Sequence, residues 1–191
     1  VVKEERRLRT EDKPTSLTYE RFNAVAYTNS PYRRPIVGWM EDLETLTVED
    51  ARLWYKTWYA PNNATLVIVG AVKHAEAQRL AKKYFAWIPR HGKQKRSKIV
   101  EPEQKTKKIL IVDDENAPAG LVEMVWRTVP LGHKDEAALD LLGKILGGGN
   151  SSRIYRDLVA EKQIAVSATA HTYNLEDDGI FSVDITQDPA A

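Results

Sequence analysis

The sequence predicts an α+β protein in which a mixed, largely antiparallel sheet forms one layer and helices form the second. Two observations carry this prediction. Apolar residues at helical spacing alternate with short runs rich in β-branched residues, and strand runs are mixed with helix pairs along the chain. The composition agrees, because 42% hydrophobic residues, 29% charged residues and a net charge of +1 are those of an ordinary globular protein.

Four segments in the first half of the chain predict helices. Residues 1–11 are charged helix formers with no cap ahead of them, so we expect the latter part of a longer helix that begins upstream. Residues 16–27 carry a second helical pattern. Thr47, followed by two acidic residues, is an N-cap signal for a helix that continues through residues 51–59, and helical spacing resumes over residues 73–86.

A domain boundary is expected in the middle of the chain. Residues 64–70 form a continuous β-branched run that predicts a strand buried on both faces. Lys and Arg are then frequent over residues 90–108, where apolar residues are few, which favours an extended linker. We therefore predict a first domain over residues 1–95, a basic linker over 96–106 and a second domain over 107–191. The second domain contains these expected elements: strands 108–112, 121–127, 165–172 and 179–186, and helices 134–146 and 151–160.

Several function classes find little support in the residues. The basic stretch 90–108 could bind phosphates, but no aromatic residue interrupts its core, so a solvated linker is favoured over a nucleic-acid site. The loop 147–153, Gly-Gly-Gly-Asn-Ser-Ser-Arg, joins two expected helices and lacks the Lys-Ser/Thr ending of a P-loop, which favours a Gly C-cap followed by a Ser N-cap. There is no cysteine, no apolar run long enough to span a membrane, and no pair of histidines at i, i+4 spacing.

An ordered series of short motifs resembles the pitrilysin/insulinase family of zinc peptidases. The series runs through these segments: Val1-Val2-Lys3-Glu4-Glu5, 30–38 (Ser-Pro-Tyr-Arg-Arg-Pro-Ile-Val-Gly), Leu46-Thr47, 58–64 (Trp-Tyr-Ala-Pro-Asn-Asn-Ala), Ile68-Val69-Gly70, Tyr84-Phe85 and 146–155 (Leu-Gly-Gly-Gly-Asn-Ser-Ser-Arg-Ile-Tyr). The resemblance spans nearly the whole chain. It implies an α+β fold built from two similar halves, with residues 1–95 as the latter part of the zinc-bearing half and residues 107–191 as the front of the non-catalytic half.

The same resemblance implies a zinc ligand. Family members carry His-x-x-Glu-His on one helix and a third ligand, a Glu, on a later helix, which leaves one zinc position for water. This sequence contains no His-x-x-Glu-His, and the Val-Val-x-Glu-Glu motif makes Glu5 the expected third ligand, with Glu4 as the alternative if the register differs by one. On composition alone, Glu5 is a solvated acid on a charged helix. We expect no catalytic residue in this chain and no activity or bound zinc in the chain alone.

One departure from the family pattern concerns substrate binding. Relatives that hold substrate in the second half place an Arg and a Tyr in a Leu-Arg-x-x-x-x-Leu-x-Tyr arrangement, whose polar groups can support developing charge on the substrate carbonyl. Val159 and Val166 occupy those positions here. The resemblance therefore implies that a homologous sister subunit supplies the Arg and Tyr to a heterodimer.

Two functions from different classes follow. The parent protein is expected to be a zinc metalloendopeptidase that hydrolyses peptides or unfolded segments in a two-part chamber, with zinc as its cofactor. The alternative is a non-catalytic scaffold or assembly subunit of the same family. No nucleic-acid partner and no membrane-spanning segment are expected. A periplasmic location is suggested only by the resemblance to bacterial relatives.

Overall fold

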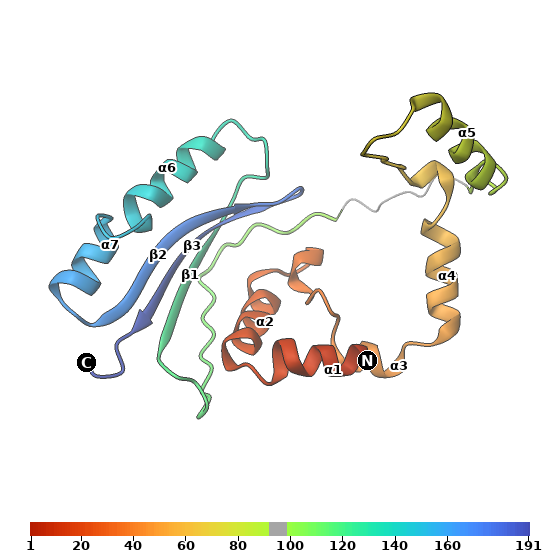
Figure 1. Cartoon of the computed structure of the whole chain (residues 1–191). Helices are drawn as coiled ribbons and strands as arrows, with labels where there is room; N and C mark the ends of the chain where they lie inside the picture. Colours follow the sequence, from red (N-terminus) through yellow and green to blue (C-terminus); the bar gives the residue numbers. More distant parts are fainter. Residues whose placement is uncertain (92–98) are drawn as a thin grey trace. The chain divides into compact units, whose positions relative to one another are not determined.

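The computed structural model describes residues 1–91 and 99–191 (Figure 1). The chain folds as two compact units. Residues 1–13 and 19–108 make up the first unit, and residues 14–18 and 109–191 make up the second. Residues 96–98 of the predicted linker lie outside the described residues, and the predicted division into domains stays a prediction.

Helices dominate the chain before residue 92. In chain order they are α1 (Val2–Arg6), the π-helix η1 (Arg7–Glu11), α2 (Pro14–Ala26), the 3-10 turn η2 (Pro31–Arg33), α3 (Met40–Thr45), α4 (Val48–Trp58), the 3-10 turn η3 (Pro61–Asn63) and α5 (His74–Phe85). The four helices expected from the sequence are all present. Thr47 caps α4 as predicted, because its hydroxyl accepts from the Asp50 backbone N–H while the Asp50 carboxylate accepts from the Thr47 backbone N–H.

Two predicted strands are wrong. Residues 64–70 and 108–112 form no strand, because neither segment pairs with another strand within the described residues. The first is also exposed where two buried faces were expected, with Val69 at 91% of its full accessibility. A β-branched run predicts extended backbone, whereas strand formation also needs a hydrogen-bonded neighbour.

The second unit contains the sheet. Its elements are β1 (Leu121–Thr128), α6 (Glu136–Gly147), α7 (Arg153–Tyr155), the π-helix η4 (Arg156–Glu161), β2 (Ala165–Asn174) and β3 (Gly179–Gln187). The strands lie in the order β1-β3-β2, and both pairs are antiparallel. The α+β class with an antiparallel sheet is therefore confirmed, together with the three strands and two helices expected in this region.

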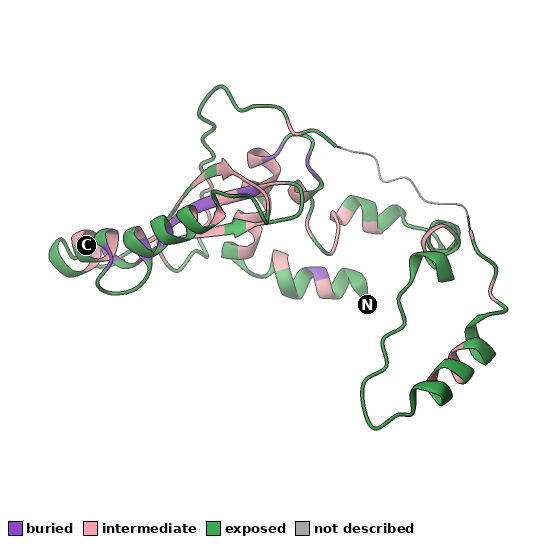
Figure 2. Ribbon diagram, turned by 90° about the horizontal axis from the view of Figure 1, so that it is seen from above, coloured by how far each residue is buried: buried purple, intermediate pink, exposed green. Residues whose placement is uncertain are grey.

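Helices cover one face of this sheet. Ala170, Phe181 and Val183 are buried there, and Leu139 and Leu146 of α6 pack against them. α6 and α7 run along that face in Figure 1, and Figure 2 shows that buried positions concentrate in the strands. Side chains alternate between faces along a strand, so the residues between these core positions lie on the opposite face.

A carboxylate and an ammonium group tie residues 101 and 108 to the end of α2, within the first unit. Three consecutive backbone N–H groups, those of Thr28, Asn29 and Ser30, donate to the Glu101 carboxylate at 2.6 Å each. The Lys108 ammonium donates to the Val25 carbonyl at 2.8 Å. Both positions are thus fixed by charge-assisted hydrogen bonds.

Candidate functional site

The candidate ligand Glu5 lies on α1, at the start of the first unit. Its side chain is 44% exposed, and Arg9, one turn later in the chain, places its Nη2 atom 3.1 Å from Glu5 Oε1. Glu4, the alternative, is more exposed and pairs with Arg7 at 2.7 Å. Both carboxylates are accessible, and the structure does not choose between them as ligands.

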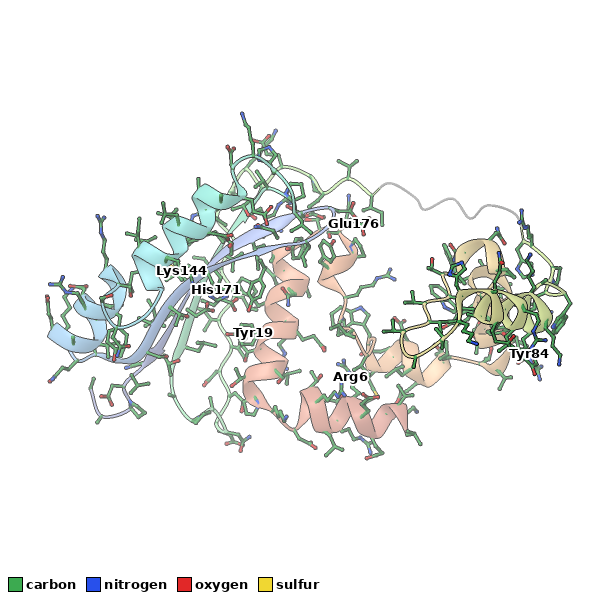
Figure 3. All side chains as sticks on the ribbon, turned by 45° about the horizontal axis from the view of Figure 1, so that its top comes forward. Arg6, Tyr19, Tyr84, Lys144, His171 and Glu176 are labelled. Atoms are coloured by element: carbon green, nitrogen blue, oxygen red, sulfur yellow. The ribbon has the colours of Figure 1, made fainter. Side chains whose placement is uncertain are left out.

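The residue that follows Glu5 is buried. Arg6 retains 4% of its accessibility, and its guanidinium donates twice to Glu20 of α2, from Nη2 to Oε1 at 2.7 Å and from Nη1 to Oε2 at 2.8 Å. Nη1 also donates to the Gly38 carbonyl at 2.8 Å. Figure 3 labels Arg6 on α1, in the first unit. One side chain therefore joins α1, α2 and the turn that precedes α3.

Two carboxylates, those of Glu20 and Glu11, lie next to the Arg6 guanidinium. Hydrogen bonding to the Glu20 carboxylate raises the pKa of Arg6, while burial acts in the opposite direction and Glu11 adds a smaller favourable contribution. Glu11 Oε1 lies 3.4 Å from Arg6 Nε. A two-bond pair between guanidinium and carboxylate fixes direction as well as distance, because both groups are planar.

A complete metal site is not found in the described part of the chain, which contains no group of three or more His, Cys, Asp or Glu residues placed to hold a metal. Glu5 fits the role of a single carboxylate ligand, since it is accessible and stands on a helix that is fixed through Arg6. Its chemistry is that of an oxygen donor to zinc, and two further ligands would have to come from elsewhere.

The two valines that the sequence comparison above predicted at the family's Arg and Tyr positions, Val159 and Val166, lie in the second unit. Val159 is half-buried in η4, and Val166 stands in β2 with 52% of its surface exposed. The pairing of β2 with β3 shifts register between Ala165 and Ser167, so Val166 is the extra residue of a β-bulge. Neither side chain carries a hydrogen-bond donor.

An open groove of about 320 Å³ lies between η4 with α7 and the sheet. Its walls are mostly apolar, with Arg153 and Asp157 as the charged members. The full lining is Met124, Arg153, Ile154, Asp157, Leu158, Val183 and Ile185. The groove offers a mostly apolar surface close in the chain to Val159.

The face of the sheet opposite the helices carries a titratable cluster that the sequence did not reveal. Glu123 of β1 is paired in register with Asp184 of β3. Burial, and then repulsion from Asp184, raises the pKa of Glu123 to about 7. Asp184 also accepts from the Ser182 hydroxyl at 2.9 Å and lies 3.6 Å from Nδ1 of His171 on β2.

Sequence reasoning missed Arg6 and Glu123, the two groups with the most distinctive surroundings. Arg6 stands in a run of charged residues, and only the fold shows that it turns inward while its neighbours face solvent. Glu123 stands in an alternating strand pattern, and that pattern does not specify which residue of the neighbouring strand lies opposite it. Neither residue carried a signal in the sequence, because the partner of each is set by the fold, Glu20 for Arg6 and Asp184 for Glu123.

Comparison with known proteins gives consistent matches. The family model described as "Peptidase M16 inactive domain" matches residues 45–191. A relative from Helicobacter pylori, "Zinc protease PqqE", is 32% identical over 183 residues, which cover 95% of this chain and 41% of the relative. A relative from Bacillus subtilis, "Uncharacterized zinc protease YmxG", is 25% identical over 91% of this chain and 41% of its own length.

Solved structures agree with these matches. "The crystal structure of a protease from Helicobacter pylori" superposes with a TM-score of 0.83 at 31% identity and covers 98% of this chain and 46% of that chain. The periplasmic protease PqqL from Escherichia coli has a TM-score of 0.74 at 18% identity, over 98% of this chain and 21% of that chain, and it supports the fold alone. The chain thus spans less than half the length of these relatives.

Proposed function

This chain belongs to the M16 peptidase family, since the family's inactive-domain model matches residues 45–191, and from that premise we propose that its parent protein is a zinc-dependent endopeptidase in which Glu5 is a zinc ligand. The resemblance to the pitrilysin/insulinase zinc peptidases is thereby confirmed. The absence of His-x-x-Glu-His from the sequence agrees with a piece of such a protein that is not catalytic by itself. The activity, substrate and partners of the whole protein are proposals.

The family motif supports Glu5 above Glu4, which stands on the same helix and is also accessible. The motif Val-Val-x-Glu-Glu places Glu5 on α1, and this helix directs Arg6 inward while the Glu5 carboxylate stays accessible. A metal ligand needs an accessible oxygen on a backbone that does not move, and both conditions are met here. The names of the relatives, which are zinc proteases, support zinc as the metal.

The proposed chemistry divides between this chain and the rest of the parent protein. Zinc, when bound, supplies an acidified water for attack on a peptide carbonyl. Glu5 would hold the metal through one carboxylate, and α1 would keep that carboxylate in place. Two imidazoles and a general base would be contributed by a His-x-x-Glu-His segment outside this chain.

We propose that substrate contacts in the second half come from a homologous sister subunit. Val159 and Val166 cannot donate hydrogen bonds to a substrate carbonyl, so developing charge there would need the partner's Arg and Tyr. The substrate class proposed is a peptide or an unfolded segment. The periplasm is the proposed location, which is supported by the description of Escherichia coli PqqL as a periplasmic protease.

A scaffold role is the second candidate, and the two valines favour it. A subunit that has lost the donors for the substrate carbonyl could also have lost the zinc motif and serve in assembly only. The matched model describes an inactive domain, which is compatible with this role. The sequence of the parent protein upstream of Val1 distinguishes the two, because His-x-x-Glu-His there supports the enzyme.

The test uses the full-length gene product that contains this chain. It is purified, its zinc content is measured by atomic absorption, and cleavage of a quenched fluorescent peptide library is followed with and without chelator. One zinc per chain and chelator-sensitive cleavage, alone or with a sister subunit, are expected. A full-length protein that contains the motif but holds no zinc would overturn the peptidase proposal.

A further inference from the structure

We propose that Arg6 is the positioning residue for Glu5: its bonds to Glu20 and Gly38 set the orientation of the helix that presents the zinc ligand. This inference rests on the proposed function, and it assigns the Arg6–Glu20 pair a role in orienting the ligand. The burial pattern of α1 and η1 is its starting observation. Across their residues, Val2 to Glu11, Arg6 is the single buried side chain.

A helix of this length needs outside contacts to hold its orientation. α1 has five residues before the backbone changes to π-helical bonding in η1, and short helices are marginal in water by themselves. Most helices are oriented by a buried apolar stripe. Here no apolar residue of either segment is buried, so the rotation of α1 about its axis depends on polar contacts.

The contacts of Arg6 are suited to that task. Its two bonds to Glu20 are 2.7 and 2.8 Å long, its bond to the Gly38 carbonyl is 2.8 Å, and the Arg6 and Glu20 side chains are 5% and 8% exposed. The planar guanidinium meets the planar carboxylate in one relative orientation. Glu5 is the adjacent residue, so a helix rotation that broke this pair would also displace the Glu5 carboxylate.

A buried ion pair gives orientation without giving much stability. Desolvation of two charges offsets most of their attraction, so replacing both partners with apolar residues of similar size is often neutral for folding. Removal of one partner leaves a buried charge and destabilises strongly. A double variant that replaces both Arg6 and Glu20 therefore distinguishes a structural role of the pair from a positioning role. If the pair were only structural, zinc affinity should change little. If it positions Glu5, zinc affinity should fall although the protein stays folded.

The experiment compares zinc affinity and thermal stability of the full-length, metal-free protein. Affinity is measured by competition with a chromophoric chelator, well below the melting temperature of every variant. For the double variant Arg6→Met with Glu20→Met, we expect an unfolding temperature close to wild type and a zinc affinity lower by about 10- to 100-fold, the range seen when groups that orient metal ligands are lost. Arg6→Lys keeps the charge but not the paired geometry, and it should show an intermediate loss of affinity.

The matched control is Glu101→Gln, which alters another carboxylate bound by several N–H groups in the same unit. It should lower the unfolding temperature and leave zinc affinity unchanged. Wild-type zinc affinity in the folded double variant would overturn the positioning role. A different result would overturn the proposed function itself. In that case the wild-type protein would bind no zinc, or Glu5→Gln would bind zinc as tightly as the wild type.

Discussion

Gly147 of α6 lies against the backbone of Ala170 in β2, so closely that a β-carbon at position 147 would overlap the Ala170 backbone nitrogen. This approach sets the distance between the helix layer and the sheet next to the buried cluster of Ala170, Phe181 and Val183. Gly143, one turn earlier on the same helix, is less confined, because a β-carbon there would lie 3.3 Å from the Ala170 carbonyl oxygen.

The first prediction compares these two glycines. Gly147→Ala should destabilise the chain by about 3 kcal/mol or more, because the strand backbone cannot move without breaking its pairing with β3. Gly143→Ala should change stability by less than about 1 kcal/mol, since the gain in helix propensity offsets the tight contact. Urea unfolding followed by circular dichroism measures both. Equal effects at the two positions would mean that α6 does not approach β2 most closely at Gly147.

A second prediction concerns the pH dependence of the second unit. The pKa of Glu123 is raised to about 7 in the folded state, mainly by burial and then by Asp184. Because the folded state then binds more protons than the unfolded state, unfolding free energy should fall as pH rises from about 4.5 to about 7. Glu123→Gln should remove this slope and stabilise the chain at pH 8 by about 1 kcal/mol, a figure reduced for the partial exposure of Glu123.

The measurement is urea unfolding of the chain at about pH 4.5 and about pH 8, on either side of the titration. Glu176→Gln serves as the control, because it makes the same chemical change at an exposed position between β2 and β3. The control should retain the wild-type slope. If Glu123→Gln changed the unfolding free energy equally at both pH values, ionisation of Glu123 would not be the cause of the pH dependence.

A third prediction tests the sister subunit. If Val159 and Val166 leave this subunit without donors for the substrate carbonyl, the full-length protein alone should cleave peptides about 10²- to 10³-fold more slowly than with its partner. Co-expression with a homologue that has Arg and Tyr at the two positions should restore the rate. A partner in which that Arg is replaced by Val is the control and should not restore it. Full activity of the protein alone would contradict the heterodimer.

The sequence predicted elements better than it predicted how they pair. α4 was expected because the signal lies within four adjacent residues, from Thr47 to Asp50, and the predicted capping box is present. The β-branched run 64–70 forms no strand within the described residues, since a ladder needs a second segment that no local pattern can specify. β2 and β3 are joined by the short segment 175–178, whereas β1 pairs with β3 from before α6, and all three strands lie where alternating apolar residues predicted them.

The candidate site depended on different information. Glu5 was predicted as a ligand from a family motif alone, because an accessible acid on a charged helix has no physical signature of its own. Arg6 could not be distinguished from Arg7 in the sequence, and its role follows from a partner 14 residues away. The raised pKa of Glu123 depends on the strand register that places it opposite Asp184, which periodicity alone does not define.

Zinc binding by the full-length protein decides whether Glu5 is a metal ligand. Glu5→Gln and Glu4→Gln make the same change at adjacent accessible positions of α1, so any general effect on the helix should be similar in both. Isothermal titration of the metal-free proteins with zinc should show an affinity at least about 100-fold lower for Glu5→Gln and an unchanged affinity for Glu4→Gln, because a lost ligand weakens a metal site more than a lost surface charge does. Wild-type affinity in Glu5→Gln would contradict the assignment, and a loss confined to Glu4→Gln would move the ligand to Glu4.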